Sequence, residues 1–465
     1  MDTSFAFDAD LLRRYDRPGP RYTSYPTAPQ FDAGFDEAQL RQAAAESNGD
    51  PIPRRLSLYV HVPFCTSPCF YCGCNRIITR DTARGEAYLA RLYREVAMTA
   101  ALFDRDREVI QLHFGGGTPN FLAPGQLGEA VDTLRHHFRF SDADDRDISI
   151  EIDPRQVSPG EIGELAAIGF NRVSLGIQDF DPRVQEAVNR IQPAADTLAI
   201  IDAARRHGMR SVNVDLIYGL PRQTPEGFAR TLDIVTGARP DRLAVYGYAH
   251  MPRLFRAQRR IVEEELPSPA SRLALLQLTI EKLTAAGYRY IGMDHFALPE
   301  DELARAQENG SLHRNFMGYT THADTDLIGL GVSAISHVGN SFSQNPRELA
   351  DWQTALDEGR LPVARGMWLD PDDAIRADLI QQLMCQGCIE VPAFERRHML
   401  RFHEYFAADL ARLQPLLDDG LARWDGKRLQ ATSRGRLLLR NMAMCFDRYL
   451  HQDVPANTLR YSRAI

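Results

Sequence analysis

Four of the seven cysteines lie within ten residues of one another, at Cys65, Cys69, Cys72 and Cys74. The first three have the spacing C-x-x-x-C-x-x-C and follow an apolar run that is typical of a strand. Soft thiolates so close together on one loop can converge on a single iron–sulfur or zinc centre. A [4Fe–4S] cluster held by only three thiolates keeps one iron open, and that iron can bind a substrate or a cosubstrate.

The other cysteines argue against the alternatives. A structural zinc site usually needs two C-x-x-C-like pairs, and here Cys385, Cys388 and Cys445 come about three hundred residues later. A disulfide is disfavoured because the N-terminus has no features of a secretory signal. We therefore predict an iron–sulfur cluster at the first three cysteines, and two buried thiols rather than a redox pair at Cys385 and Cys388.

Composition describes an ordinary globular chain of 465 residues, with 44% hydrophobic and 25% charged residues. No window is apolar enough over sufficient length to span a bilayer, so we expect no membrane insertion and a cytoplasmic protein. The net charge of −8 disfavours a general nucleic-acid surface, although local basic patches can still exist.

Apolar runs and amphipathic stretches alternate six times, which predicts six β/α units. A parallel sheet covered by helices follows from this order, and six units favour a partial (β/α)6 barrel related to the eightfold one. The strands are expected at residues 56–61, 109–114, 148–152, 172–177, 212–217 and 243–248. The helices are expected at about 86–103, 126–138, 159–168, 182–189, 196–207 and 225–236.

In such folds the reactive groups gather at the carboxyl ends of the strands. The cysteines follow the first strand, and Gly115-Gly-Gly117 with Thr118 follows the second. The glycines let backbone approach a ligand and could offer N–H groups to an amino acid's carboxylate. Glu151, Gln178 and Asp215 lie at later strand ends. They could be satisfied core residues, but their gathering at one mouth favours a binding role.

Four segments are predicted. Residues 1–50 form an extended arm in which prolines prevent a regular helix around Arg13–Pro26, and residues 51–265 form the partial barrel. Residues 266–365 extend the barrel and close the site, and residues 366–465 form a mainly helical, winged-helix-like domain. Its two-stranded wing is expected at 421–424 and 428–431, before a helix at about 434–449.

These motifs resemble a known family. The three-cysteine motif with Tyr71 before its last cysteine, followed by Gly-Gly-Gly-Thr-Pro119, is similar to the radical S-adenosylmethionine superfamily. Within it, three further features resemble the oxygen-independent coproporphyrinogen III oxidases. They are Arg21-Tyr-Thr-Ser-Tyr-Pro-Thr27 in the arm, Cys74-Asn75 after the third cysteine, and the Asn315–Thr321 motif. The resemblance covers nearly the whole chain.

This resemblance implies a reaction and its cofactors. A [4Fe–4S] cluster on the three cysteines would cleave S-adenosylmethionine, and the resulting 5′-deoxyadenosyl radical would take a hydrogen from a propionate side chain. Loss of CO₂ would leave a vinyl group, twice per molecule, turning coproporphyrinogen III into protoporphyrinogen IX. The family further implies two S-adenosylmethionine molecules, a reduced flavodoxin- or ferredoxin-like electron donor and a monomer.

The family's binding residues can be carried over by position. Those around the first S-adenosylmethionine match Tyr59, Gly116, Glu151 and Ile335. Those around the second match Tyr71, Gly117, Thr118, Gln178, Arg190, Asp215 and Ala249, and Phe316 is also assigned to cofactor binding. Tyr59 and Cys74 are the candidate catalytic residues. The chemistry agrees, because Glu151 and Asp215 suit hydroxyl or ammonium groups and Arg190 suits a carboxylate.

One position departs from the family pattern. Met317 stands where we expect glutamine, and a thioether cannot donate an amide's hydrogen bonds, so the second cosubstrate's contacts differ here. The substrate's four carboxylates need a local basic surface. The arginines that could supply it are Arg13, Arg14, Arg17, Arg21, Arg253, Arg256, Arg259 and Arg260.

Three other functions compete. A heme chaperone of the same superfamily shares the cysteine motif but generally lacks Cys74 and the Arg21–Pro26 motif, both of which are present here. A radical methyltransferase that opens heme shares much of the barrel. A winged-helix sensor with a cluster is disfavoured by the overall acidity and by the complete set of polar strand ends.

Overall fold

The computed structural model describes residues 7–451 and residue 461. They form two compact units, each made of separate stretches of chain. One, the sheet unit, comprises residues 31–282 and 324–368; the other, the terminal unit, comprises residues up to 30, 283–323 and 369 onward. The predicted arm and C-terminal domain both extend beyond the described residues, into 1–6 and into 452–460 and 462–465.

A mixed sheet is the frame of the sheet unit. Its strand order is β9-β8-β7-β6-β4-β1-β14-β15-β16-β17, parallel from β9 to β14 and antiparallel beyond. The strands are β1 (Arg55–Val62), β4 (Glu108–Gly116), β6 (Asp147–Ile152), β7 (Arg172–Gln178), β8 (Ser211–Tyr218), β9 (Arg242–Gly247), β14 (Thr325–Leu330), β15 (Ile335–Val338), β16 (Ser341–Gln344) and β17 (Arg365–Trp368).

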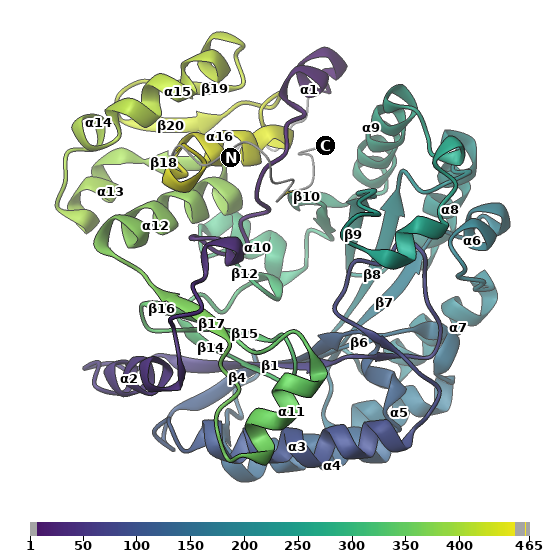
Figure 1. Cartoon of the computed structure of the whole chain (residues 1–465). Coiled ribbons are helices and arrows are strands. Elements are labelled where there is room, and N and C mark those ends of the chain that lie inside the picture. The colour runs from purple at the N-terminus through teal and green to yellow at the C-terminus, as the bar shows by residue number, and fades with distance from the viewer. Residues whose placement is uncertain (1–6, 452–460, 462–465) are drawn as a thin grey trace. The chain divides into compact units, whose positions relative to one another are not determined.

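Helices follow the parallel strands and lie along the outside of the sheet (Figure 1). They are α3 (Ala83–Ala100), α4 (Pro124–His137), α5 (Pro159–Ile168), α6 (Pro182–Ala187), α7 (Ala194–Arg206) and α8 (Pro225–Ala238). Other helices with residues in this unit are α2 (Glu37–Asn48), α9 (Pro269–Ala285) and α11 (Leu349–Asp357). The α/β fold and the six predicted β/α units are thus confirmed, with β14 as a further parallel strand.

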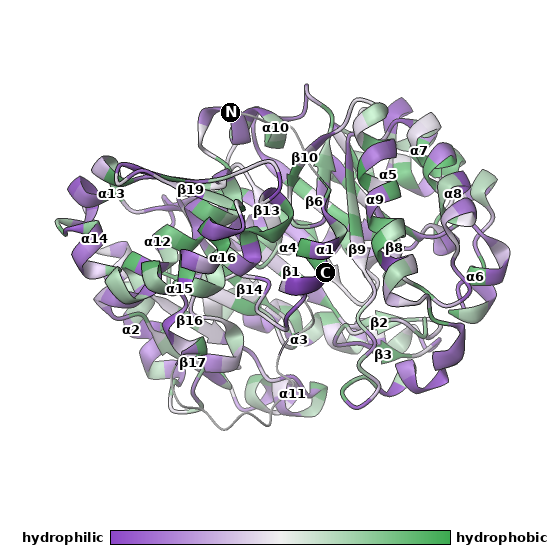
Figure 2. Ribbon diagram, turned by 90° about the horizontal axis from the view of Figure 1, so that it is seen from above, coloured by the Kyte–Doolittle hydropathy of each residue, from purple (hydrophilic) through white to green (hydrophobic). Residues whose placement is uncertain are grey.

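Local sequence explains where these elements begin and how they pack. Ser158 caps α5 in a capping box with Glu161, Pro159 stands at the first helical position, and Gly169 ends the helix at φ 115°. The parallel strands alternate, so that one face carries buried apolar side chains that pack under the helices, and the other carries the polar residues that reach the cavity. Figure 2 shows strands and covering helices in their hydropathy colours. Leu58, Leu112 and Val214 are fully buried among them.

The terminal unit is mainly helical. Its helices are α1 (Ala9–Tyr15), α10 (Glu302–Asn309), α12 (Pro371–Gln386), α13 (Val391–His398), α14 (Phe402–Tyr405), α15 (Ala407–Asp418) and α16 (Leu439–Cys445). Its strands are β10 (Arg289–Gly292), β11 (His295–Ala297), β12 (His313–Asn315), β13 (Gly318–Thr320), β18 (Cys388–Glu390), β19 (Ala422–Trp424) and β20 (Arg428–Ala431). Both strands of the predicted wing are present, and β18 adds a third.

Two sequence-based expectations are wrong in detail. Arg13–Tyr15 belong to helix α1, because Asp8 accepts hydrogen bonds from the first free N–H groups and the helix ends before Pro18. The helix expected at 434–449 is broken into α16 and two short 3₁₀ turns, η6 (Arg436–Leu438) and η7 (Arg448–Leu450). Cys385 and Cys388 are buried and unbridged, as predicted, although the second lies on β18.

No helix of the described chain has the length and apolarity to cross a membrane.

Candidate active site

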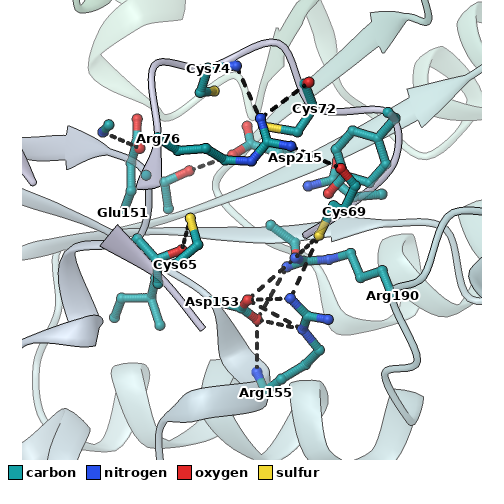
Figure 3. Close-up of a pocket in the computed structure, with 18 of the residues that line it drawn as sticks. Cys65, Cys69, Cys72, Cys74, Arg76, Glu151, Asp153, Arg155, Arg190 and Asp215 are labelled. Carbon is teal, nitrogen blue, oxygen red and sulfur yellow. Dashed lines mark hydrogen bonds and ion pairs between the residues drawn. The ribbon is translucent and has the colours of Figure 1, made fainter. Parts of the chain in front are cut away.

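A cavity of about 290 Å³ opens at the carboxyl ends of the parallel strands, within the sheet unit (Figure 3). It brings together residues from the cysteine loop and from the ends of β4, β6, β7, β8 and β9. Its lining comprises Cys65, Ser67, Cys69, Tyr71, Cys72, Cys74, Arg76, Gly116, Gly117, Thr118, Pro119, Glu151, Ile152, Asp153, Arg155, Ser174, Gly176, Gln178, Arg190, Asp215, Ile217 and Tyr246.

The cysteine loop is closed by a short pair of parallel strands. Strand β2 (Phe64–Cys65) pairs with β3 (Ile77–Ile78), so the chain from 66 to 76 forms one loop. Arg76 donates to the carbonyl oxygens of Cys72 and Cys69, both at 3.3 Å, and thereby holds the loop in shape. All four loop cysteines are free thiols.

Two of the predicted cluster thiols have neutral hydrogen-bond partners, although the charge of Arg76 also acts to lower the pKa of both. The Cys65 sulfur lies 3.3 Å from the Thr118 hydroxyl, and burial raises the pKa of this thiol to about 11. The Cys72 sulfur accepts a hydrogen bond from the Cys74 amide at 3.4 Å. Hydrogen bonds from Cys74 lower the pKa of Cys72 to about 6, and the same contact raises the pKa of Cys74. Cys74 therefore favours the thiolate form of Cys72.

The third thiol, Cys69, faces a buried ion-pair network. Arg190 and Arg155 reach its sulfur at 3.5 and 3.7 Å, and both guanidinium groups also bind the carboxylate of Asp153. Burial alone would raise the pKa of Asp153, but the two arginines lower it to about 2. Arg190 also donates to the Gly176 carbonyl at 2.6 Å. Its side chain is only 7% exposed, so it is no solvated surface charge.

Two further carboxylates line the cavity, Glu151 and Asp215, and neither is bound by a guanidinium group in the contacts given below. Glu151 accepts from the Gly116 amide at 3.2 Å and lies 3.3 Å from the His113 ring. Burial acts to raise the pKa of Glu151, but these contacts lower it overall. Asp215 accepts hydrogen bonds from Ser174 and Asn213 at 2.9 and 3.0 Å. Burial and then the charge of Glu151 raise the pKa of Asp215 to about 6.

The glycines after β4 allow close packing. A Cβ on Gly116, at φ 115°, would lie 2.7 Å from the His61 ring, and one on Gly117 would lie 2.8 Å from the Pro63 carbonyl oxygen. Their N–H groups, however, already donate to Glu151 and to the Val62 carbonyl oxygen. The expectation that these two amides serve a ligand carboxylate is therefore not met in this structure.

Gln178 reaches the cavity through a β-bulge. The register between β7 and β8 shifts between Gly176 and Gln178, and Gln178 has the left-handed φ of 70°. A Cβ on Gly176 would lie 2.9 Å from the Gln178 amide nitrogen, so only glycine leaves that side chain its place.

Four predicted site residues are not among those that line the cavity. Tyr59 lies on β1, where its ring stacks on His113 and its hydroxyl lies 3.1 Å from the His61 ring. Ile335 begins β15, and its backbone packs on Gly329, the partner of Tyr59 in β14. Ala249 follows the end of β9. Phe316, beside Met317, lies between β12 and β13 in the terminal unit.

Some lining residues were missed by the sequence analysis. They include Arg76, Asp153, Arg155, Ser174 and Tyr246, none of which was assigned a binding role. The order Asp153-Pro-Arg155 directly after a strand was a usable signal, because that position faces the mouth of the fold. Arg76 stands two residues after Cys74 and carries no comparable pattern.

The residues fit a [4Fe–4S] cluster. The three thiols converge on one cavity, and three guanidinium groups line the same space and can balance thiolate charge. The Nε atoms of Arg76 and Arg190 are buried without a hydrogen-bond partner. Within the described chain, no three His, Cys, Asp or Glu side chains are gathered as they would be around a single metal ion.

Comparison with known proteins agrees with this geometry. Residues 59–235 match the Radical SAM superfamily and residues 369–438 match the HemN C-terminal domain. Fold and site therefore define a radical S-adenosylmethionine protein. The oxygen-independent coproporphyrinogen III oxidase of Pseudomonas aeruginosa is 52% identical over 465 residues, covering 100% of both chains. That of Escherichia coli K12 is 48% identical over 459 residues, covering 99% of this chain and 98% of its own.

A solved structure extends the match to three dimensions. Coproporphyrinogen III oxidase (HemN) from Escherichia coli, described as a radical SAM enzyme, superposes with a TM-score of 0.91 at 47% identity. The alignment covers 96% of this chain and 100% of that one. The chain belongs to the family of oxygen-independent coproporphyrinogen III oxidases.

Proposed function

We propose that the protein is an oxygen-independent coproporphyrinogen III oxidase. It converts two propionate side chains of coproporphyrinogen III to vinyl groups and so forms protoporphyrinogen IX. The observation that carries this proposal is the single cavity in which three thiols meet polar groups from successive strand ends, in a chain whose relatives bear that name. The enzyme acts in the cytoplasm, as a monomer.

Cys65, Cys69 and Cys72 would hold the [4Fe–4S] cluster in this cavity. When bound, the reduced cluster and S-adenosylmethionine supply the oxidising radical that removes a substrate hydrogen. The chain's own residues position the reactants and exclude water. Tyr71 and Ile217 belong to the apolar cluster formed with Val188, Leu220 and Tyr248, which closes one side of the cavity.

We further propose that two S-adenosylmethionine molecules bind. The site of the first S-adenosylmethionine is formed by Glu151 and Gly116 together with Tyr59 on β1 and Ile335 on β15. Gln178, Arg190 and Asp215 belong to the site of the second, with Tyr71, Gly117 and Thr118. A carboxyl held at a pKa near 6, such as Asp215, can accept or donate a hydrogen bond around neutral pH. Ala249 and Phe316 complete the set that the family resemblance assigns.

An anaerobic turnover assay tests this function. The reconstituted protein is mixed with coproporphyrinogen III, S-adenosylmethionine, a reductant and cell extract that supplies the electron acceptor. We expect protoporphyrinogen IX with about two 5′-deoxyadenosines per product, and no product from Cys69→Ala. Flavodoxin or ferredoxin replaces the chemical reductant in a second series, because we propose a donor of that kind. If the protein keeps an intact cluster and binds heme but does not decarboxylate coproporphyrinogen III, it is instead a heme chaperone.

A further inference from the structure

The three cluster thiols differ in the charge of their surroundings. Cys65 has the neutral Thr118 hydroxyl beside it, and Cys72 has the Cys74 amide. Among the described residues, guanidinium groups donate to the sulfur of Cys69 alone of the three, from Arg155 and Arg190. Arg76 donates to carbonyl oxygens of the loop, and its charge acts on Cys65 and Cys72 from there. The function proposed above assigns no role to Arg155 or to Asp153, although both line the cavity.

These groups form a unit with one unbalanced positive charge. Asp153 carries a single negative charge and Arg155 and Arg190 carry one positive charge each, so the three together are singly positive. Arg155 binds Asp153 through two nitrogens, at 2.6 and 2.9 Å, and the backbone amide of Arg155 donates to the same carboxylate at 3.1 Å. The side chains of Asp153 and Arg155 are 7% and 17% exposed, so solvent screens the excess charge poorly.

Protein contacts hold Arg155 and its partner Asp153 in place. Its carboxylate partner caps the 3₁₀ turn η3 (Pro154–Gln156), which directly follows β6, and Asn120 donates to the Asp153 carbonyl oxygen at 3.1 Å. Rigid support of this kind is what outer-shell partners of metal ligands provide. Figure 3 shows dashed lines from both guanidinium groups to the Cys69 sulfur and to the Asp153 carboxylate, which lies beside them.

We propose that Arg155, held by Asp153, is a positioning residue for Cys69 that makes the cluster easier to reduce. A cluster with three thiolate ligands changes its net charge from −1 to −2 when it takes up one electron. A charged hydrogen bond to a ligand sulfur stabilises the more negative state, and hydrogen bonds to sulfur are among the determinants of cluster potentials. This inference rests on the cluster of the proposed function and does not depend on the substrate.

The test is a redox titration followed by electron paramagnetic resonance, without substrate. Dithionite supplies single electrons to the reconstituted wild type and to Arg155→Met, which keeps the volume and removes the charge. We expect the equilibrium constant for reduction to fall about tenfold or more in Arg155→Met, which for one electron is a midpoint potential about 59 mV more negative. Arg155→Lys, which keeps the charge, should stay closer to the wild type.

Arg183→Met is the matched control. Arg183 lies in the same unit, its side chain is 63% exposed, and its loss removes the same charge from a group whose ion-pair partner is Asp181. An unchanged potential in Arg155→Met, or an equal shift in the control, overturns the proposal. If Arg155→Met assembles no cluster, Arg155→Gln decides in the same way, because it also lacks the charge. A normal shift in a protein that makes no protoporphyrinogen would leave this inference standing and reject the proposed substrate.

Discussion

Two aspartates in the same cavity have pKa values shifted in opposite directions. Asp153 lies between two guanidinium groups, which bring its pKa down to about 2 although burial acts in the other direction. Asp215 has only Ser174 and Asn213 as hydrogen-bonding side chains, and its pKa rises to about 6 because burial is not offset. One wall of the cavity is therefore built around permanent charges, and the other carries a carboxyl that can hold a proton.

The difference matches the ligands that each wall would meet. Thiolate ligands are anionic, so a cationic wall beside Cys69 lowers the cost of keeping them there. Ribose hydroxyls and ammonium groups need acceptors that they can approach without a competing cation, which is what Asp215 and Glu151 provide. Burial alone thus does not determine how an aspartate behaves; its partners do.

The largest expected effect comes from breaking the charged wall. Asp153→Asn leaves two buried guanidinium groups without their shared carboxylate, and such a loss typically costs about 3–5 kcal/mol of folding free energy. Urea unfolding at pH 7 measures it. Asp215→Asn is the matched control, since its hydrogen-bonding neighbours Ser174 and Asn213 are neutral; at pH 7 it should not lower stability and should raise it by up to about 3 kcal/mol, because it removes a buried charge. Equal losses in both variants would contradict the division into two walls.

An intermediate effect is expected in the pH dependence of stability. The folded protein keeps the Asp215 proton up to about pH 6, whereas the ordinary value is 3.8. The native state therefore binds more protons at Asp215 between these values, and the contribution of Asp215 to the free energy of unfolding falls as pH rises from about 4 to 6, by about 3 kcal/mol at most.

Urea unfolding of wild type and Asp215→Asn across that range measures this contribution. The difference between the two proteins isolates Asp215, because Glu95, whose pKa burial raises to about 7, is present in both. A difference that stays constant over the range would show that Asp215 titrates normally. The pKa of Asp153 is shifted in the opposite direction, so its contribution to the free energy of unfolding is lost as pH falls from about 4 toward 2.

The smallest effect, a change in midpoint potential, is expected at Cys65, whose sulfur has a neutral hydrogen-bond partner. Thr118→Val removes the hydroxyl 3.3 Å from the Cys65 sulfur and keeps the shape of the side chain. A neutral hydrogen bond is about half as strong as a charged one, so the midpoint potential should move less than in Arg155→Met. A larger shift in Thr118→Val would mean that charge is not what distinguishes Cys69 from Cys65.

Periodic segments and cap signals were predictable from the sequence. The six parallel strands fall within two residues of their expected positions, because each carries apolar residues at every other position or more between polar turns. The breaks in the helix expected at 434–449 were not predictable, because its apolar and basic pattern continues across them. The structure divides these residues among α16 and two 3₁₀ turns. Tertiary packing there overrides local preference.

The candidate site was predictable only in part. The cysteine loop and the strand-end residues Glu151, Gln178 and Asp215 could be assigned to one mouth, since parallel strands end together. Arg190 could be assigned only through the family resemblance, and only the fold shows that it is buried against Asp153. Pairs such as Arg155 with Cys69, 86 residues apart, leave no local pattern in a single sequence.

The network around Cys69 also has a consequence for the order of assembly. The three cluster cysteines lie on one loop, so an unfolded chain can already gather iron and sulfide there. The arginines that face Cys69 come from 86 and 121 residues farther along, after β6 and α6. A cluster bound before these strands pair would lack its counter-charges. We therefore expect the loop to hold its cluster more tightly once the sheet is complete, so that cluster retention reports on the folding of chain far from the loop.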